Sequence, residues 1–390
     1  MTKITLFSQI FQKLPKDAIK KTIREHGTDK HSKGFNTWTH FVSMVFCQFA
    51  DCVSLRDISN GLKSATGNLN HLGIKDAPSK STIGYQNEHR DSGVFKAIYY
   101  KVLEYLGQQV VGGRRIHGLK TPVKLLDSTL ISLCMELYDW ARYTHTKGAI
   151  KLHTLLDFST FLPEYVYITD GKGADSKSAR EVRVTPHCIV VADRGYCDFA
   201  LLDHWDSMDV FFVVRHRENL LFHTVEELDL PPTGHQDVLK DEIIELDGPL
   251  TKGKYPKRLR RIAVYNEEHD FVVELLTNNF TLAASTIAAL YKARWKIEIF
   301  FRNLKQLCHI KSFVGTSRNA VEIQIWTALT TMLILAYLKS IAAYPWHLSN
   351  LVHSLRLNTF TKIDLETWLN NPFSPPEDDL ESDTQGILAF

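Results

Sequence analysis

Three acidic residues, far apart along the chain, occupy positions where a carboxylate can do chemistry. Two of them interrupt or end strands that the sequence predicts to be buried: Asp127 in "KLLDST" and Asp193 in "VVADRG". A carboxylate at such a position is costly unless a hydrogen-bonded cap or a metal ion compensates it. Because ligands of open α/β sheets sit at strand ends, these two acids rank first as metal ligands. Asp157 and Asp170, on or after outer hairpin strands, rank below them.

The third acid, Glu298, is the only carboxylate in the basic and aromatic segment "YKARWKIEIFFRNLK", residues 291–305. At about 100° per residue, a helix places a phenol, a guanidinium, this carboxylate and an ammonium on one stripe roughly 60° wide. The stripe consists of Tyr291, Arg294, Glu298 and Lys305. Its opposite side is apolar, with Ile297, Phe300, Phe301, Leu304 and Leu307. A solvated face with i,i+4 ion pairs would also produce this pattern.

The three carboxylates meet if the helix packs on the predicted sheet. Three carboxylates with few other ligands suit Mg²⁺, a hard ion that keeps its waters and binds phosphate oxygens. Two such ions about 3.5–4 Å apart can activate an attacking oxygen and stabilise the leaving oxygen at phosphorus. The pattern therefore predicts two Mg²⁺ ions held by Asp127, Asp193 and Glu298, and we expect Mn²⁺ to substitute.

The bases around Glu298 suit phosphates. Arg294, as a bidentate fork, and Lys305, as a point charge, would hold the phosphates that flank the scissile bond. Tyr291 would donate one more hydrogen bond, and Trp295 could stack on a base. The partner predicted from these residues is DNA.

Two other segments are candidates for DNA contact. "SKSTIGYQNEHR", residues 79–90, resembles a recognition helix because Gln, Asn and Arg read base edges, which makes Arg90 a candidate. An ordinary helical hairpin with a polar surface is the alternative. Residues 252–261 contain six Lys and Arg residues, among them Lys257 and Arg258. Such a run is usually a solvated face, but on a curved β-rich insertion it could bind a phosphate backbone.

The elements that position these residues fall into five stretches. Apolar residues at helical spacing predict helices through residues 1–112. Residues 113–214 follow the order β-β-β-α-β-α-β, which predicts a mixed α/β sheet with flanking helices. Residues 215–280 are typical of antiparallel strands separated by turns and form the predicted insertion. Helices return over 281–345, starting at Thr286, and 346–390 form a C-terminal segment with an acidic tail that we expect to be mobile.

Composition sets the class of protein. With 390 residues, 44% hydrophobic and 23% charged, the chain is expected to be globular with two or three domains. The net charge is +2, and removing the five acids of the last twenty residues leaves +7, which permits a nucleic-acid partner. The six cysteines lack zinc-site spacing. The N-terminus has no signal-peptide pattern and the apolar stretch 323–338 is too short to span a bilayer, so we expect a cytoplasmic protein without membrane contact.

These motifs resemble a known family. The spacing Tyr291-x2-Arg294-x3-Glu298-x6-Lys305 is similar to the Y-R-E-K signature of bacterial cut-and-paste insertion-sequence transposases of the DDE superfamily. "DST" at 127–129 and "ADRGY" at 192–196 resemble the first and second aspartate motifs of that group. The match spans roughly residues 120–345 and includes a β-rich insertion between the second aspartate and the glutamate. The N-terminal helical region resembles, more loosely, the terminal-repeat-binding segment of related elements.

The resemblance implies a ribonuclease-H-like catalytic core with Asp127, Asp193 and Glu298 as its metal triad. It also implies contacts from Tyr291, Arg294 and Lys305 to the transposon-end strand. The implied reaction is hydrolytic nicking at the ends of the element, followed by attack of the freed 3′-OH on target DNA. A homodimer that holds two ends is the implied assembly.

Three questions stay open at this level. A DNA-binding repressor derived from a transposase would bind without chemistry, and a structure-selective nuclease on the same fold would cut without joining. Some family members free the second strand through a DNA hairpin, helped by a base stacked on an insertion-domain tryptophan. Here no Trp lies between Trp205 and Trp295, so the sequence leaves the hairpin route undecided.

Overall fold

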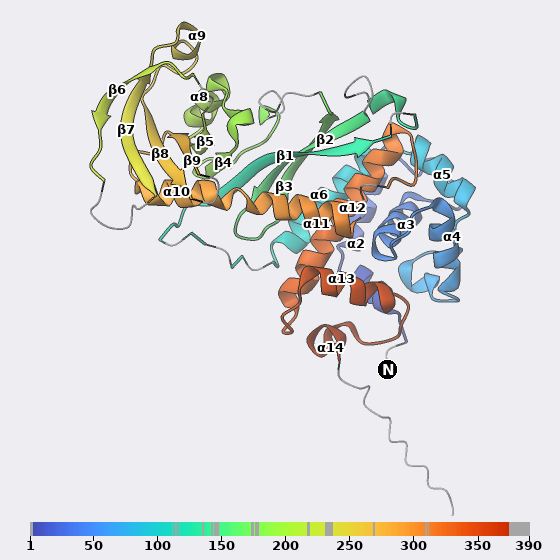
Figure 1. Ribbon diagram of the computed structural model, residues 1–390. Coiled ribbons are helices and arrows are strands. Elements are labelled where there is room, and N and C mark those ends of the chain that lie inside the picture. Colours follow the sequence, from blue (N-terminus) through green and yellow to red (C-terminus); the bar gives the residue numbers. More distant parts are fainter. Residues whose placement is uncertain are drawn as a thin grey trace, which may run out of the picture.

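Within the described residues, the strands of the chain form one nine-stranded sheet in the order β3-β2-β1-β4-β5-β9-β8-β7-β6 (Figure 1). The computed structural model describes residues 3–373, except 111, 114, 117, 135, 142, 144–147, 173, 174, 176–178, 217, 218, 231–236, 268, 269, 309 and 311. The strands are β1 Val123–Leu133, β2 Gly148–Asp157, β3 Pro163–Asp170, β4 Ile189–Ala192, β5 Phe211–Arg215, β6 Phe222–Glu227, β7 Val238–Leu246, β8 Leu259–Asn266 and β9 Phe271–Thr277.

The direction of the strands changes across the sheet. β1, β4 and β5 run parallel, and β2 and β3 pair antiparallel on the β1 side. All four residues of β4 are buried, as the continuous apolar run at this position predicted. On the other side β5 pairs antiparallel with β9, and β8, β7 and β6 follow, also antiparallel. The antiparallel strands predicted within 215–280 are therefore present, and they extend the same sheet.

The helices lie at one end of the sheet and across its faces. They are α1 Leu6–Gln12, α2 Lys16–His26, α3 Thr37–Phe49, α4 Leu55–Ser64, α5 Lys80–His89, α6 Gly93–Gly107, α8 Phe199–Ser207, α9 Pro249–Lys252, α10 Ala284–Ala293, α11 Lys296–Leu307, α12 Arg318–Ile341, α13 Leu348–Leu357 and α14 Leu365–Asn370. Figure 1 shows α2 to α6 gathered with α12 and α13 at the end opposite β6. The sheet thus has a helical end and a β-rich end.

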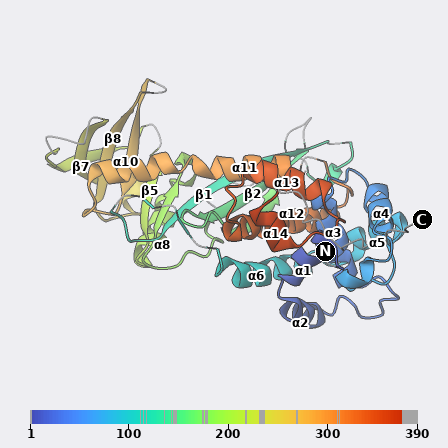
Figure 2. The ribbon, with the colours of Figure 1, turned by 90° about the horizontal axis from the view of Figure 1, so that it is seen from below.

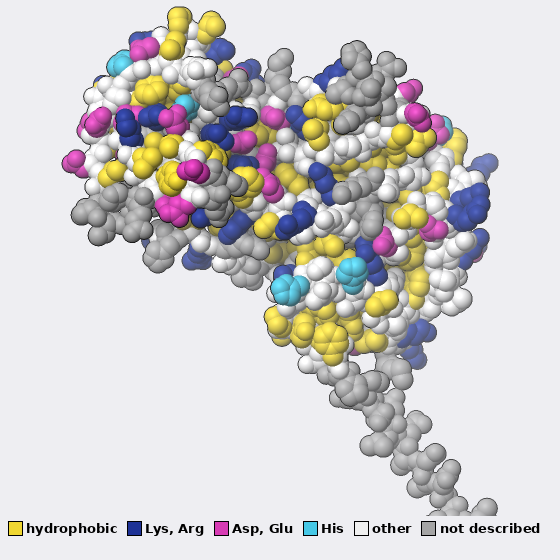
Figure 3. Space-filling view, viewed as in Figure 1, with side chains coloured by type: hydrophobic (Ala, Val, Ile, Leu, Met, Phe, Trp, Pro, Cys, Tyr) yellow, Lys and Arg dark blue, Asp and Glu magenta, His cyan; other side chains and the backbone are white. Residues whose placement is uncertain are grey.

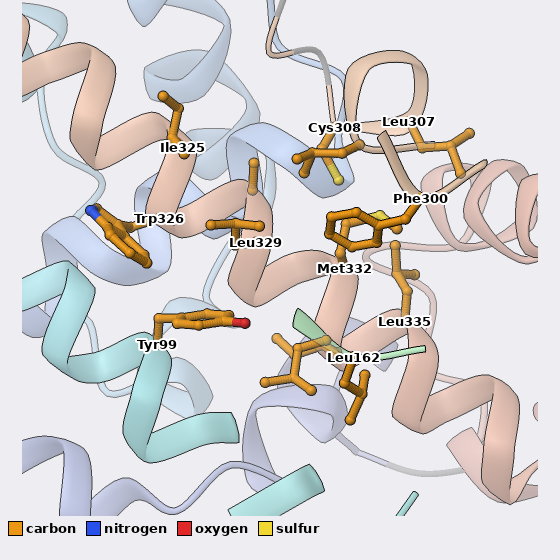
Figure 4. Packing of buried hydrophobic residues seen from close by; sticks show 14 of the residues in the cluster. Tyr99, Leu162, Phe300, Leu307, Cys308, Ile325, Trp326, Leu329, Met332 and Leu335 are labelled. Atoms are coloured by element: carbon orange, nitrogen blue, oxygen red, sulfur yellow. The ribbon is translucent and has the colours of Figure 1, made fainter. Parts of the chain in front are cut away.

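One apolar core connects the N-terminal helices to the rest of the molecule. Buried residues of α1, α3 and α6 belong to the same cluster as residues of α11, α12 and one face of the sheet. Figure 4 shows the centre of this cluster, where Tyr99 of α6 lies near Trp326 of α12, and Phe300 of α11 lies near Met332 and Leu335 of α12. The helix that carries Glu298 is therefore held by the same core that holds the N-terminal helices.

α12 is the central core helix. It has 24 residues, and its length and composition alone would let it cross a membrane. However, 89% of its most apolar 18 residues are buried inside the protein. Its apolar stretch is part of the core cluster, as the sequence predicted, and the helix is longer than that stretch. Burial by protein explains its composition without a bilayer.

α4 and α5 begin at side-chain caps from Ser54 and Ser79. They pack against each other, but residues 65–79 separate them and include the 3₁₀ turn Leu69–Leu72. A helix-turn-helix joins its helices through three or four residues. The pair is therefore not a helix-turn-helix of the usual form, and that interpretation of 79–90 is corrected.

Two further sequence expectations change. The helix predicted to run on from Thr286 is divided into α10, α11 and α12, and α10 and α11 lie nearly in line in both ribbon views (Figures 1 and 2). Arg294 and Trp295, between them, keep right-handed helical backbone angles. The sequence also predicted a short helix over 176–184, the first helix in the order β-β-β-α-β-α-β; residues 176–178 lie outside the described residues, and residues 180–184 are turn, bend or irregular backbone, so the helix is not present there. The acidic tail from 377 onward lies outside the described residues.

Candidate active site

The parallel pairing of β1 and β4 brings two acids to one place. Leu126 and Ala192 are partners across the two strands, and Asp127 and Asp193 are the next residue of each. β4 ends at Ala192, whereas β1 continues, paired with β2 as far as Leu133. Asp193 then starts the 3₁₀ turn Arg194–Tyr196. Both aspartates thus lie at the carboxyl edge of the parallel strands, where α/β sheets place ligands.

The junction of α10 and α11 faces this edge. The Tyr291 hydroxyl donates to Asp193 Oδ1 at 3.0 Å, and Arg294 Nη1 donates to Asp127 Oδ2 at 2.9 Å. Arg294 Nη1 also lies 4.0 Å from Glu298 Oε1. Tyr291 is 9% exposed and Arg294 is 5% exposed, so neither belongs to a solvated helix face. The junction joins all three predicted acids through two buried donors.

The acids lie close enough to act on one another. Burial raises the pKa of Asp127 to about 6, Arg294 lowers it in part, and the charges of Asp193 and Glu298 raise it further. Burial also raises the pKa of the Tyr291 hydroxyl to about 12, and the negative charge of Asp193 adds to that rise. The three carboxylates therefore share one electrostatic environment, with the Arg294 guanidinium as its nearest cation.

The chemistry of these donors fits a hard divalent ion, but their present spacing does not form a metal site. Across the part of the chain that the structure describes, no three His, Cys, Asp or Glu side chains lie close enough together to hold one ion. Arg294 and Tyr291 occupy one oxygen each of the two aspartates, and the Glu298 side chain is 47% exposed. The expected convergence of three carboxylates on shared ions is thus not seen in this arrangement, because protein donors satisfy the aspartates instead.

A cleft opens beside these acids. It has a volume of about 390 Å³ and contains Asp127, Glu298, Arg302 and Lys305 in its wall. The predicted signature lysine therefore faces the same cleft as two of the acids. Figure 3 shows acidic side chains gathered between the β6–β9 end and the rest of the sheet, with basic side chains along α10 and α11. Such mixed lining suits a phosphate that is bridged to carboxylates by cations.

A second, larger hollow lies along α10 and the start of α11. Its volume is about 740 Å³, and β7, β8, β9, α10 and α11 line it. Trp295 contributes to its wall and is 49% exposed. The Arg294 guanidinium lies 5.1 Å from the Trp295 ring centre and 5.6 Å from that of Tyr291. The two residues beside which the Arg294 guanidinium lies, Tyr291 and Trp295, thus both line the larger hollow.

The other predicted DNA contacts lie elsewhere. Arg90 is 5% exposed and donates to the Phe35 carbonyl at 2.8 Å, with its guanidinium over the Phe35 ring. The prediction that Arg90 reads bases is wrong, because its side chain is buried inside the helical end and bonds to the protein itself. Lys257 pairs with Asp206, and Arg258 Nε pairs with Glu245 at 3.0 Å. Both side chains are about half exposed, so they stay at the surface with their charges partly balanced.

The structure adds two residues that sequence reasoning missed. Ser128 Oγ donates to Asp175 Oδ1 at 2.8 Å, beside the aspartate edge. No spacing in the sequence pointed to Asp175, because it lies between the third and fourth strands without a periodic partner. The serine of the "DST" motif was a weak signal, since a hydroxyl next to a candidate ligand often orients it.

Comparisons with known proteins show the family of the chain. A family model described as "Transposase DDE domain" matches residues 118–334, more than half of the chain, and "Domain of unknown function (DUF4372)" matches residues 2–75. The transposase y4zB of Sinorhizobium fredii is 30% identical over 66% of this chain and 71% of its own length. The transposase for insertion sequence element IS5377 of Geobacillus stearothermophilus is 25% identical over 66% and 67% of the two chains.

Two further similarities complete the comparison. The transposase for insertion sequence element IS4SA of Synechocystis sp. is 26% identical over 66% of this chain and 71% of its own. A piggyBac transposase solved by cryo-EM as a synaptic complex with hairpin DNA is 12% identical, covers 95% of this chain and 81% of its own, and has a TM-score of 0.40, too low to establish a common fold. From the family match and the curated relatives, the chain belongs to the bacterial insertion-sequence transposases with a DDE domain.

Proposed function

We propose that this transposase binds the terminal inverted repeats of its insertion sequence and performs Mg²⁺-dependent cleavage and 3′-OH strand transfer by a cut-and-paste route. The observation that supports this most is the junction of α10 and α11, which donates hydrogen bonds to Asp127 and Asp193 and places Arg294 in an ion pair with Glu298. The Y-R-E-K spacing of that junction supports membership of the corresponding subgroup. The parallel strands β1, β4 and β5, with antiparallel β2 and β3 beside β1, support a ribonuclease-H-like core.

Asp127, Asp193 and Glu298 would hold the ions once their protein donors turn away. Bound Mg²⁺ would supply Lewis-acid stabilisation at phosphorus and lower the pKa of the attacking hydroxyl group. The raised pKa of Asp127, about 6, still leaves the carboxylate mostly ionised at neutral pH, as a metal ligand must be. Both reaction steps displace an oxygen at phosphorus, so one set of carboxylates can serve both.

DNA would recruit the donors that now face the acids. Arg294 Nε is buried without a hydrogen-bond partner among the described residues, so a phosphate oxygen can compete for this guanidinium. Lys305, in the wall of the cleft, would hold a second phosphate, and the exposed Trp295 ring would stack on a base. Lys257 and Arg258 would add longer-range attraction to the backbone. We propose a homodimer as the assembly that holds two ends.

The test uses Mg²⁺, labelled ends taken from the DNA that flanks the gene, and a target plasmid. A transposase cuts the ends and joins them, a nuclease on this fold cuts only, and a transposase-derived repressor binds only. Asp127→Asn, Asp193→Asn and Glu298→Gln should each abolish cleavage and leave end binding largely intact. Asp170→Asn, an exposed acid on β3, is the matched control and should cut as the wild type does. Cleavage that survives in any triad variant would contradict the assignment.

A further inference from the structure

Asp175 lies beside both segments that carry the proposed catalytic aspartates. Its Oδ1 atom accepts from Ser128 Oγ at 2.8 Å, and Ser128 directly follows Asp127 on β1. A Cβ atom added to Gly195 would lie 3.1 Å from Asp175 Oδ2, and Gly195 comes two residues after Asp193. One carboxylate is therefore bonded to the strand of the first aspartate and lies next to the turn of the second.

The contact lies behind the acids. Successive side chains of a strand point to opposite faces, so Ser128 points away from the face on which Arg294 meets Asp127. Asp175 is 26% exposed and comes from the connection between β3 and β4. It thus reaches the aspartate segments from the side opposite α11 and does not compete with Arg294.

The charge of Asp175 is compensated locally. Lys151 Nζ lies 3.2 Å from Asp175 Oδ1, and the fully buried His153 places Nδ1 at 3.6 Å from the same oxygen. Burial lowers the pKa of His153 to about 4, so this imidazole is neutral near pH 7 and Lys151 is the balancing cation. A carboxylate already paired with an ammonium is a poor extra metal ligand but a rigid anchor.

A buried hydroxyl lies close to both Asp175 and the acids. The Tyr196 side chain is 1% exposed, within the 3₁₀ turn that follows Asp193. Burial raises the pKa of its hydroxyl well above the usual value, and the charges of Asp175, Asp127 and Asp193 each raise it further. The Tyr196 hydroxyl therefore lies within the field of all three carboxylates.

We propose that Asp175 is a positioning residue that sets the separation of Asp127 and Asp193 by holding Ser128 through a hydrogen bond and packing against the turn at Gly195, and so sets the affinity of the site for divalent metal. The inference rests on the proposed function, because it takes those aspartates as the metal ligands. It also accounts for glycine at 195, since a side chain there would push Asp175 away. Partners of metal ligands typically contribute 10–100-fold to metal affinity.

The experiment measures Mn²⁺ binding to the full chain without DNA, by the EPR signal of free Mn²⁺. Asp175→Asn and Asp175→Ala should weaken binding by about tenfold or more. Ser128→Ala should weaken it less, and it leaves every charge in place if the Asp175 variants fold poorly. Glu181→Gln, an exposed acid nearby, is the control and should bind as the wild type does. Wild-type Mn²⁺ affinity in folded Asp175→Ala or Ser128→Ala would overturn the proposal.

The outcome separates this inference from the proposed function. Asp127→Asn must lose Mn²⁺ binding if the catalytic assignment holds, whatever Asp175 does. If Asp127→Asn binds as the wild type does, the metal assignment fails. If it loses binding while the Asp175 and Ser128 variants keep it, the positioning role fails and the metal assignment stands.

Gly195→Ala gives an independent check. Gly195 lies outside the left-handed region, so alanine can adopt its backbone, and the added methyl group is tight only against Asp175. We expect Gly195→Ala to weaken Mn²⁺ binding in the wild type and to change it much less in Asp175→Ala, where the space is free. Coupled sites give such non-additive cycles. Equal effects in both backgrounds would show that Gly195 does not act through Asp175.

Discussion

At the scale of single residues, two side chains of the Y-R-E-K signature contact the acids of the site in the protein without DNA. The spacing of Tyr291 and Arg294 predicted a polar stripe, and the structure turns that stripe inward onto the two aspartates. The Arg294 guanidinium forms an ion pair with Asp127 at 2.9 Å. A metal ion and Arg294 therefore compete for one carboxylate, and a phosphate that attracts Arg294 favours the ion. Coupling of this kind is reciprocal.

Arg294→Gln should move two measurements in opposite directions. Without DNA, Mn²⁺ binding should tighten several-fold, because a competing cation is removed from Asp127. Binding to the ends should weaken, and the slope of log affinity against log salt should fall by about 1, since one phosphate contact is lost. Lys20→Gln, an exposed cation on α2, is the charge-matched control and should change neither. An unchanged salt slope in Arg294→Gln would count against the phosphate contact.

At the scale of elements, the order of strands and helices can be predicted from the sequence, because apolar residues recur with a different period in strands and in helices. The fully apolar run of β4, the hairpins β1–β3 and the caps at Ser54 and Ser79 were predictable for this reason. Periodicity states which face of an element is apolar, but it does not name the partner of a polar group. The burial of Arg90 under Phe35 and the reach of Asp175 to Ser128 depend on contacts between distant segments, so local patterns could not predict them.

The pairing of α3 with α5 makes stability depend on pH. His40 is fully buried and its Nε2 lies 2.7 Å from Asn87 Oδ1. Burial lowers the pKa of His40 to about 3, and the charge of Arg90 lowers it further. The unfolded chain, in which the histidine pKa is near 6.5, therefore binds more protons between about pH 6.5 and 3. The contribution of neutral His40 is complete above about pH 6.5 and is lost as the pH falls.

His40→Gln removes this titration and keeps an amide that can donate to Asn87. We expect the variant to be less stable than the wild type at pH 7.5, because glutamine does not reproduce the packing of the buried His40 ring. The gap between their melting temperatures should narrow as the pH falls to 5. A gap that stays constant from pH 7.5 to 5 would show that His40 does not titrate in this window. His89→Gln, on the exposed side of α5, is the control and should show no such narrowing.

At the scale of the whole molecule, one core and an uneven charge determine how the protein meets DNA. The apolar cluster extends from α1 to α14, so the helical end and the sheet with its acids form a connected body. Within that cluster Trp346 and Trp368 pack against each other at 5.4 Å between ring centres, so α14 is part of the core. The five acids of the tail follow α14 in the sequence. Charge in the tail can therefore be changed without removing core residues.

Deleting residues 374–390 removes those acids and raises the net charge from +2 to +7. Because counterion release drives non-specific binding, the shortened chain should bind random duplex DNA several-fold more tightly at low salt. The difference should shrink as salt is raised, since the electrostatic term is screened. A full-length chain with all five acids changed to Asn or Gln separates charge from length and should behave like the deletion. If only the deletion binds more tightly, the tail acts by occupying space near the DNA surface, and the charge argument fails.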